Sequence, residues 1–245
     1  MSDATLAEIF ERTCRALDVE RRAWIVAAAH CVDPLPAPAP RLAAVAQRAM
    51  DSGEVPAGPY AFRPGPAALD VSGVDRQVEL TCHLDGGRRF QGRITLEESG
   101  VLCEALTRSG HLDDGSHEPS HVMLSDVESV LVDMVHLVEA CAAETGYRGA
   151  VRLMLGVACE IPGTPLELRV YDEAGGDLLR PAAGYDRFDP VILEYPVPLS
   201  EAERAHLLWD TAVAIGYAFG VFLPQLVGQA RQSIEPLPGP GVAAD

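Results

Sequence analysis

The stretch Ser125–Gly146 constrains the fold most, because it is the clearest helix-forming segment of the 245-residue chain. Its apolar residues recur at three- and four-residue steps and form one stripe: Val127, Val130, Leu131, Met134, Val138 and Cys141. Ser125 and Glu128 have the spacing of a capping box, and Gly146 is placed to end the helix in a left-handed conformation. Period-two segments lie on both sides, so we expect this helix to pack across a sheet.

The strongest hairpin signal lies at 76–98, where apolar and polar residues alternate on both sides of Asp85-Gly86-Gly87. Further strands are predicted at 101–107, 151–159, 166–171 and 191–197. A last helix is predicted to begin at Ser200, which forms a second capping box with Glu203. The sequence therefore predicts an α+β fold. We expect a two-layer sandwich of a mainly antiparallel sheet, with long helices at 125–145 and 200–223 on one face and a small N-terminal helical part.

The predicted division of the chain has four parts. Residues 1–52 are expected to be a helical N-terminal region, with helices beginning at Thr5, over Val19–His30 and over Arg41–Asp51. Residues 53–75 are rich in Pro and Gly and are interpreted as a linker. The α+β domain is predicted to span 76–228, followed by a disordered tail at 229–245.

The charge composition narrows the possible functions. All 19 basic residues are Arg, against 36 acidic residues, and the net charge is −17. The absence of Lys argues against P-loop nucleotide hydrolases, protein kinases and pyridoxal-phosphate enzymes, because each uses a Lys at its reacting centre. The negative charge repels phosphate backbones, so direct nucleic-acid binding is not expected.

The cysteines and the N-terminal sequence indicate a reducing compartment. The six Cys residues are scattered without a CxxC pair, as buried reduced thiols are. The first residues lack the basic start and apolar core of a signal peptide. The uncharged run of the last helix is too short for a membrane span, which needs about 20 apolar residues. We therefore expect a cytoplasmic protein that does not enter a membrane.

One loop concentrates side chains that can bind a metal. His111, His117 and His121 lie within eleven residues of each other, together with Asp113, Asp114 and Glu118. Imidazoles and carboxylates this close could hold a divalent cation such as zinc. Their spacing matches no known site type, and a polar surface loop is the alternative interpretation. No catalytic residue and no cofactor is predicted elsewhere, because the chain has no GxSxG or GxGxxG motif.

Two family resemblances bear on function. RLAAVAQRAMDSGEVPAGPY resembles the first helix and turn of GntR-type winged-helix regulators, and would imply a DNA-binding role for residues 41–65. The recognition-helix start expected after that turn is absent.

The second resemblance covers about residues 76–225. The words GYRGAVRLMLGV and YDRFDPV resemble the C-terminal accessory region of actinobacterial proteins that carry a Schlafen-type AlbA-like domain. The resemblance implies an α+β accessory module and supplies no catalytic residues. The Schlafen-type domain itself has no counterpart in residues 1–75.

Three functional hypotheses follow. The first is a non-catalytic binding or regulatory module that acts through contact with a partner protein or a second copy. It is favoured because the last helix carries apolar residues around most of its circumference, beyond what one sheet face can cover. The second is a metal-assisted hydrolase that uses the histidine loop, and the third is a GntR-like transcription regulator.

Overall fold

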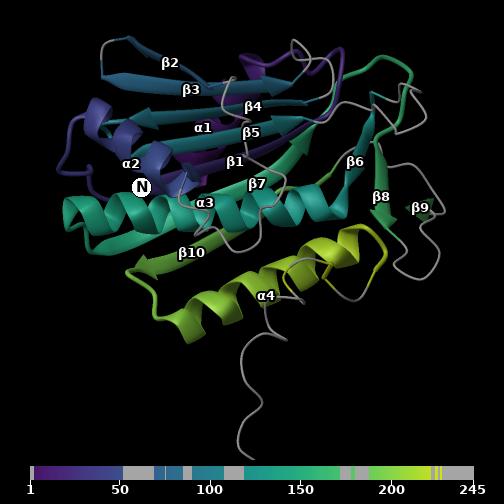
Figure 1. Cartoon of the computed structure of the whole chain (residues 1–245). Helices are drawn as coiled ribbons and strands as arrows, with labels where there is room; N and C mark the ends of the chain where they lie inside the picture. Colours follow the sequence, from purple (N-terminus) through teal and green to yellow (C-terminus); the bar gives the residue numbers. More distant parts are fainter. Residues whose placement is uncertain are drawn as a thin grey trace, which may run out of the picture.

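The computed structural model describes residues 3–51, 69–74, 76–84, 90–107, 119–171, 178–179, 188–221, 224–225 and 227. Within these residues a seven-stranded antiparallel sheet packs against helices, which confirms the predicted α+β class (Figure 1). The helices are α1 (Asp3–Arg15), α2 (Ala39–Asp51), α3 (Leu124–Thr145) and α4 (Glu201–Ala218). The strands of the sheet, in spatial order, are β10 (Val191–Val197), β7 (Gly149–Ala158), β1 (Trp24–Cys31), β5 (Val101–Thr107), β4 (Phe90–Glu97), β3 (Gln77–Leu84) and β2 (Leu69–Val74).

A smaller sheet stands at one end of α3. Its strands are β6 (His121–Met123), β8 (Glu167–Tyr171) and β9 (Leu178–Leu179). The predicted hairpin is confirmed, because β3 and β4 pair antiparallel from Gln77 opposite Glu97 to Leu84 opposite Phe90. The segment predicted as a strand at 166–171 forms β8, which pairs with β6 in the small sheet and not with the large one.

Helix α3 crosses one face of the large sheet, with α2 and α4 on either side of it (Figure 1). Met134 and Leu131 on its predicted stripe are fully buried. Val132, outside that stripe, is only 2% exposed. The buried surface of α3 is wider than the stripe because the flanking helices cover its sides. The helix ends at Gly146, whose φ of 74° confirms the predicted left-handed cap.

The two predicted capping boxes have different outcomes. The one at the start of α4 is confirmed, because the Ser200 side chain accepts a hydrogen bond from the Glu203 backbone and the Glu203 carboxylate accepts one from the Ser200 backbone. The one at Ser125 is wrong, because α3 begins at Leu124 and Met123 makes no side-chain cap. Glu128 is fully buried, and its carboxylate accepts hydrogen bonds from the backbone N–H groups of Gln225 (2.9 Å) and Val227 (3.3 Å).

The main correction concerns residues 19–30, which were predicted to be helical. Trp24–Cys31 forms β1, a strand near the centre of the large sheet that pairs with β5 and β7. All eight of its residues are buried, because Ile25 and its face meet α3 while Val26 and its face meet α1. The run of three alanines at 27–29 has high helix propensity, and burial on both faces overrides that propensity. Strand β2 likewise lies inside the segment predicted to be a linker.

The face of the sheet opposite α3 is covered by α1 alone among the described helices. Ile9 packs there with Ala28, Val101 and Cys103. On the other face, α4 contacts α3 and β10, and its residues Leu207 and Ala218, with Val221 just beyond its end, are partly buried against the main core. Within the described ranges, none of the helices has the length and hydropathy needed to cross a membrane.

Candidate functional site

Helix α1 is held on the sheet by its own apolar face and by a polar anchor just beyond its C-terminus. Leu6 and Ile9 are buried against the strands. After the helix, the Asp18 carboxylate accepts a hydrogen bond from the Trp24 indole Nε1 (2.8 Å) and forms an ion pair with Arg22 (2.9 Å). Because Trp24 is the first residue of β1, this contact fixes the end of α1 relative to the central strand.

A second stripe of α1 forms one wall of a groove. This stripe, at residues 7, 10, 11, 14 and 15, follows helical spacing and faces the end of β7. The resulting cavity, which we call the α1 groove, has a volume of about 840 Å³. It is lined by Ala7, Phe10, Glu11, Cys14, Arg15, Leu17, Val19, Glu20, Met154, Val157, Ala158, Cys159, Glu160, Leu166, Phe188 and Pro190.

The floor of the α1 groove depends on a glycine. A Cβ placed on Gly156 of β7 would lie 2.9 Å from Phe10 Cζ and 3.2 Å from Pro190 Cγ. The bare backbone therefore lets the Phe10 ring and Pro190 approach the strand. The same face continues to β10, where Ile192 lies opposite Met154 and is 47% exposed. An apolar surface thus runs from the α1 groove to the edge strand.

The ionisable groups of the α1 groove divide into thiols inside and carboxylates at the rim. Burial, followed by the nearby Glu160 carboxylate, raises the pKa of Cys14 to about 12. Burial also raises the pKa of Cys159. Both thiols are therefore protonated at neutral pH and are poor nucleophiles. Glu11, Glu20 and Glu160 make no ion pair with any residue in the described part of the chain.

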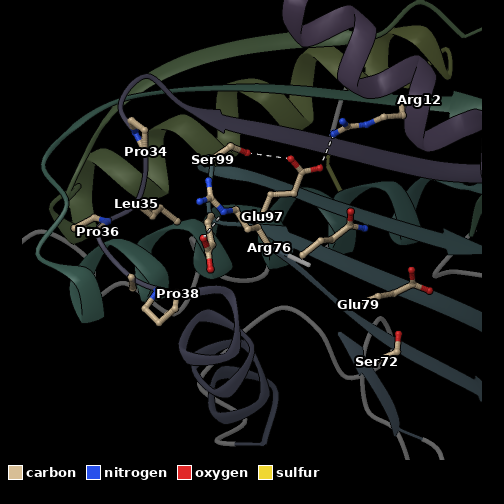
Figure 2. Close-up of a pocket in the computed structure, with 13 residues that line it drawn as sticks. Arg12, Pro34, Leu35, Pro36, Pro38, Ser72, Arg76, Glu79, Glu97 and Ser99 are labelled. Carbon is tan, nitrogen blue, oxygen red and sulfur yellow. Dashed lines mark hydrogen bonds and ion pairs between the residues drawn. The ribbon is translucent and has the colours of Figure 1, made fainter. Parts of the chain in front are cut away.

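A second cavity of about 920 Å³, which we call the proline cleft, lies at the far end of β3 and β4 (Figure 2). Residues 34–38 form one side, and the end of β4 forms another. The Glu97 carboxylate accepts hydrogen bonds from Arg12 Nη2 (2.6 Å) and Ser99 Oγ (2.9 Å), as the dashed lines in Figure 2 show. Glu98 pairs with Arg76 at 3.6 Å and accepts a hydrogen bond from the Ala39 backbone at the start of α2.

The charges of the proline cleft are therefore already engaged in holding elements together. Glu97 joins α1 to β4, and Glu98 caps α2. A ligand would have to break these contacts, which makes the proline cleft the weaker candidate for a binding site.

A buried carboxyl pair lies between β5 and α3. Glu104 is 1% exposed, and neither of its carboxylate oxygens has a hydrogen-bond partner among the described residues. Burial, together with the nearby Asp133 carboxylate, raises the pKa of Glu104 well above its usual range. Burial raises the pKa of Asp133 to about 7. Two such groups are most stable in this environment when at least one is protonated.

The predicted metal ligands are only partly placed. His121 lies in β6, is 8% exposed, and has its pKa lowered by burial. His111 and His117 lie outside the described residues, so His121 is the one member of the predicted set of three that the structure places. In the described part of the chain, no group of three or more His, Cys, Asp or Glu side chains could hold a metal ion. The metal site stays a prediction.

The segment that resembles GntR regulators contains α2, which packs into the core through Leu42 and Ala46. Its basic residues Arg41 and Arg48 both form ion pairs with Glu144 at the end of α3 (2.9 and 3.3 Å). Both side chains lie on the surface, and their positive charges are paired within the protein by the Glu144 carboxylate. Residues 52–65 of that segment lie outside the described residues.

The α1 groove was not found from the sequence. One wall comes from a predicted helix, but the floor needs β1 and β7 to be neighbours, and the sequence pattern predicts a helix where β1 lies. The available signal was the helical spacing of Ala7, Phe10 and Cys14. Comparison with models of known protein families finds no match, and comparison with characterised proteins finds no relative.

Proposed function

We propose that this protein is a non-catalytic binding module that takes an apolar segment of another protein chain into the α1 groove. The observation that carries the proposal is the α1 groove itself. It is a cavity of about 840 Å³ with mainly apolar walls, on the sheet face that a single described helix covers. Apolar cavities of roughly 300–1,000 Å³ are the usual size of specific binding sites in proteins.

The chemistry of the lining supports binding more than catalysis. The thiols of Cys14 and Cys159 have raised pKa values, which disfavours the thiolate that a nucleophile needs. The remaining ionisable side chains of the lining, Glu11, Arg15, Glu20 and Glu160, stand beside apolar walls. Burial of the apolar walls against an apolar partner would be favourable. The exposed Ile192 beside them extends the surface that such a partner would cover.

The experiment is selection of short random displayed peptides on the purified protein, repeated on two matched variants. Ala7→Phe places a large side chain on the wall of the α1 groove, whereas Ala214→Phe makes the same change at an exposed position of α4. We expect the Ala7→Phe variant to bind the selected peptides at least about tenfold more weakly. The Ala214→Phe variant should bind them as the unchanged protein does.

Melting temperatures of both variants that match that of the unchanged protein would show that both are folded. Peptides that bind the Ala7→Phe variant as tightly as the unchanged protein, or no selected peptide at all, would contradict the proposal.

A further inference from the structure

We infer that the segment bound in the α1 groove is cationic, with an apolar stretch flanked by Lys or Arg residues. This inference rests on the proposed function and adds the charge of the partner to it. It follows from the way the carboxylates are arranged around the two cavities.

The rim of the α1 groove carries three carboxylates, Glu11, Glu20 and Glu160, and one guanidinium group, Arg15. None of the three carboxylates forms an ion pair within the described ranges. Two of them, Glu160 and Glu11, lie close enough to the Cys14 thiol to raise its pKa, so they stand directly beside the apolar wall. The rim is acidic where a bound segment would leave the groove.

In the proline cleft, the carboxylates form ion pairs that join neighbouring elements of the fold. There, Glu79 pairs with Arg93 at 2.5 Å, Glu97 with Arg12 at 2.6 Å and Glu98 with Arg76 at 3.6 Å. Every carboxylate that lines the proline cleft thus has an Arg partner. By contrast, none of the described Arg residues pairs with Glu11, Glu20 or Glu160 in the α1 groove.

A bound segment would shield the rim carboxylates from water. An uncharged or acidic segment would leave them without a partner, which weakens binding. A segment with Lys or Arg beside its apolar stretch would pair with them at the point where water is displaced. The net charge of −17 acts in the same direction over longer distances, because it attracts cationic chains and repels anionic ones.

The test begins with the random peptides whose binding Ala7→Phe weakens at least about tenfold, because these are the peptides that occupy the α1 groove. We expect this groove-dependent pool to contain more Lys and Arg, relative to Asp and Glu, than the starting library. Its members should bind about fivefold or more weakly when the salt concentration is raised from about 0.05 to 0.5 M, because rim charge pairs are screened.

Charge removal gives the matched comparison. The double variant Glu11→Gln/Glu160→Gln should lose most of the salt dependence and bind the cationic peptides about fivefold more weakly at low salt. The control Glu8→Gln/Glu201→Gln removes the same charge from exposed positions that do not line the α1 groove, and should bind as the unchanged protein does.

The outcomes separate the two proposals. A groove-dependent pool without an excess of basic residues, or with binding that salt and Glu11→Gln/Glu160→Gln leave unchanged, would overturn the inference while the proposed function stands. The absence of any groove-dependent peptide would overturn both.

Discussion

The two faces of the large sheet are covered by helices to different degrees. The more covered face carries residues that stabilise the fold, and the less covered face carries residues that can contact a partner. The α3 face is covered by α2, α3 and α4, and its side chains, such as Met134 and Leu153, are fully buried. The α1 face has one described helix, which leaves Ile192 exposed and the α1 groove open. We therefore expect changes on the α3 face to alter stability, and changes along the α1 groove to alter binding.

The largest expected effect is a charge placed on the closed face. Met134→Asp should lower the free energy of unfolding by at least ~3 kcal/mol, because the new carboxylate would be buried without a partner. The matched change Ile192→Asp, at a side chain that is 47% exposed on the α1 face, should cost no more than ~0.5 kcal/mol. Urea unfolding followed by circular dichroism measures both. Equal losses would show that the two faces are not closed to different degrees.

Val132→Asp sharpens the same comparison. The sequence pattern places Val132 outside the apolar stripe, so that a charge there would cost little. The structure places it at 2% exposed, and the variant is expected to unfold nearly as easily as Met134→Asp. A stability equal to that of the unchanged protein would mean that α2 and α4 do not cover the sides of α3.

The next effect concerns the buried acid pair on the closed face. Because burial raises the pKa of Glu104 and raises that of Asp133 to about 7, the folded protein holds more protons than the unfolded chain does. The contribution of these two groups to the free energy of unfolding should therefore be completely present below the ordinary carboxyl pKa of about 4, and it should be lost as the pH rises through 7. Glu104→Gln removes one of the two charges and should stabilise the protein at about pH 8 by on the order of 2 kcal/mol.

The benefit of Glu104→Gln should shrink as the pH is lowered toward about 4, where Glu104 and Asp133 are both protonated in the folded unchanged protein. Melting temperatures across this range measure it, with the exposed Glu8→Gln as the control. A benefit that is the same at all pH values would show that Glu104 and Asp133 do not titrate in the folded state.

On the α1 face, the polar anchor offers a smaller effect. Asp18→Ala removes the hydrogen bond to Trp24 and the ion pair with Arg22, and should cost about 1–2 kcal/mol. The neighbouring exposed change Glu20→Ala should cost almost nothing. Thermal unfolding of the two variants gives the comparison, and equal melting temperatures would mean that Asp18 does not secure the end of α1.

The smallest effect is expected in the proline cleft. Arg12→Ala breaks the ion pair with Glu97. Because the Arg12 side chain is 57% exposed, the loss should lower the free energy of unfolding by no more than about 1 kcal/mol. Urea unfolding at low and high salt measures the loss. A cost well above that, or one that salt does not reduce, would show that Arg12 does more than join α1 to β4.

The sequence was sufficient for elements whose pattern and end signals agree. In the sequence of the β3–β4 hairpin, strict alternation flanks the turn-forming residues Asp85-Gly86-Gly87, and in that of α3 an apolar stripe is followed by Gly146. It was insufficient for β1, because a strand buried on both faces carries no alternation, and its alanines favour a helix. Only the pairing with β5 and β7 makes it a strand.

The same limit explains why the α1 groove could not be predicted. Its walls come from distant parts of the chain, at α1, β7 and Pro190, and they are brought together because α1 packs on β1 while β1 pairs with β7. Nor could a pattern distinguish Glu97, which pairs with Arg12, from Glu11, which pairs with none of the described Arg residues, since ion pairing depends on which elements are neighbours. The histidine loop is a separate case, because only His121 of its three histidines lies among the described residues and the metal site stays a prediction.

The central claim, that the α1 groove is where another protein binds, is tested most directly by site-specific photo-crosslinking in living host cells. A photoreactive phenylalanine analogue would replace Leu17 in the α1 groove or, in the matched control, the exposed Tyr217 of α4. We predict that the probe at Leu17 crosslinks to one segment of another protein, mapped by mass spectrometry to an apolar stretch beside Lys or Arg, and that the probe at Tyr217 does not. Crosslinks that form at Tyr217 but not at Leu17 would contradict the account.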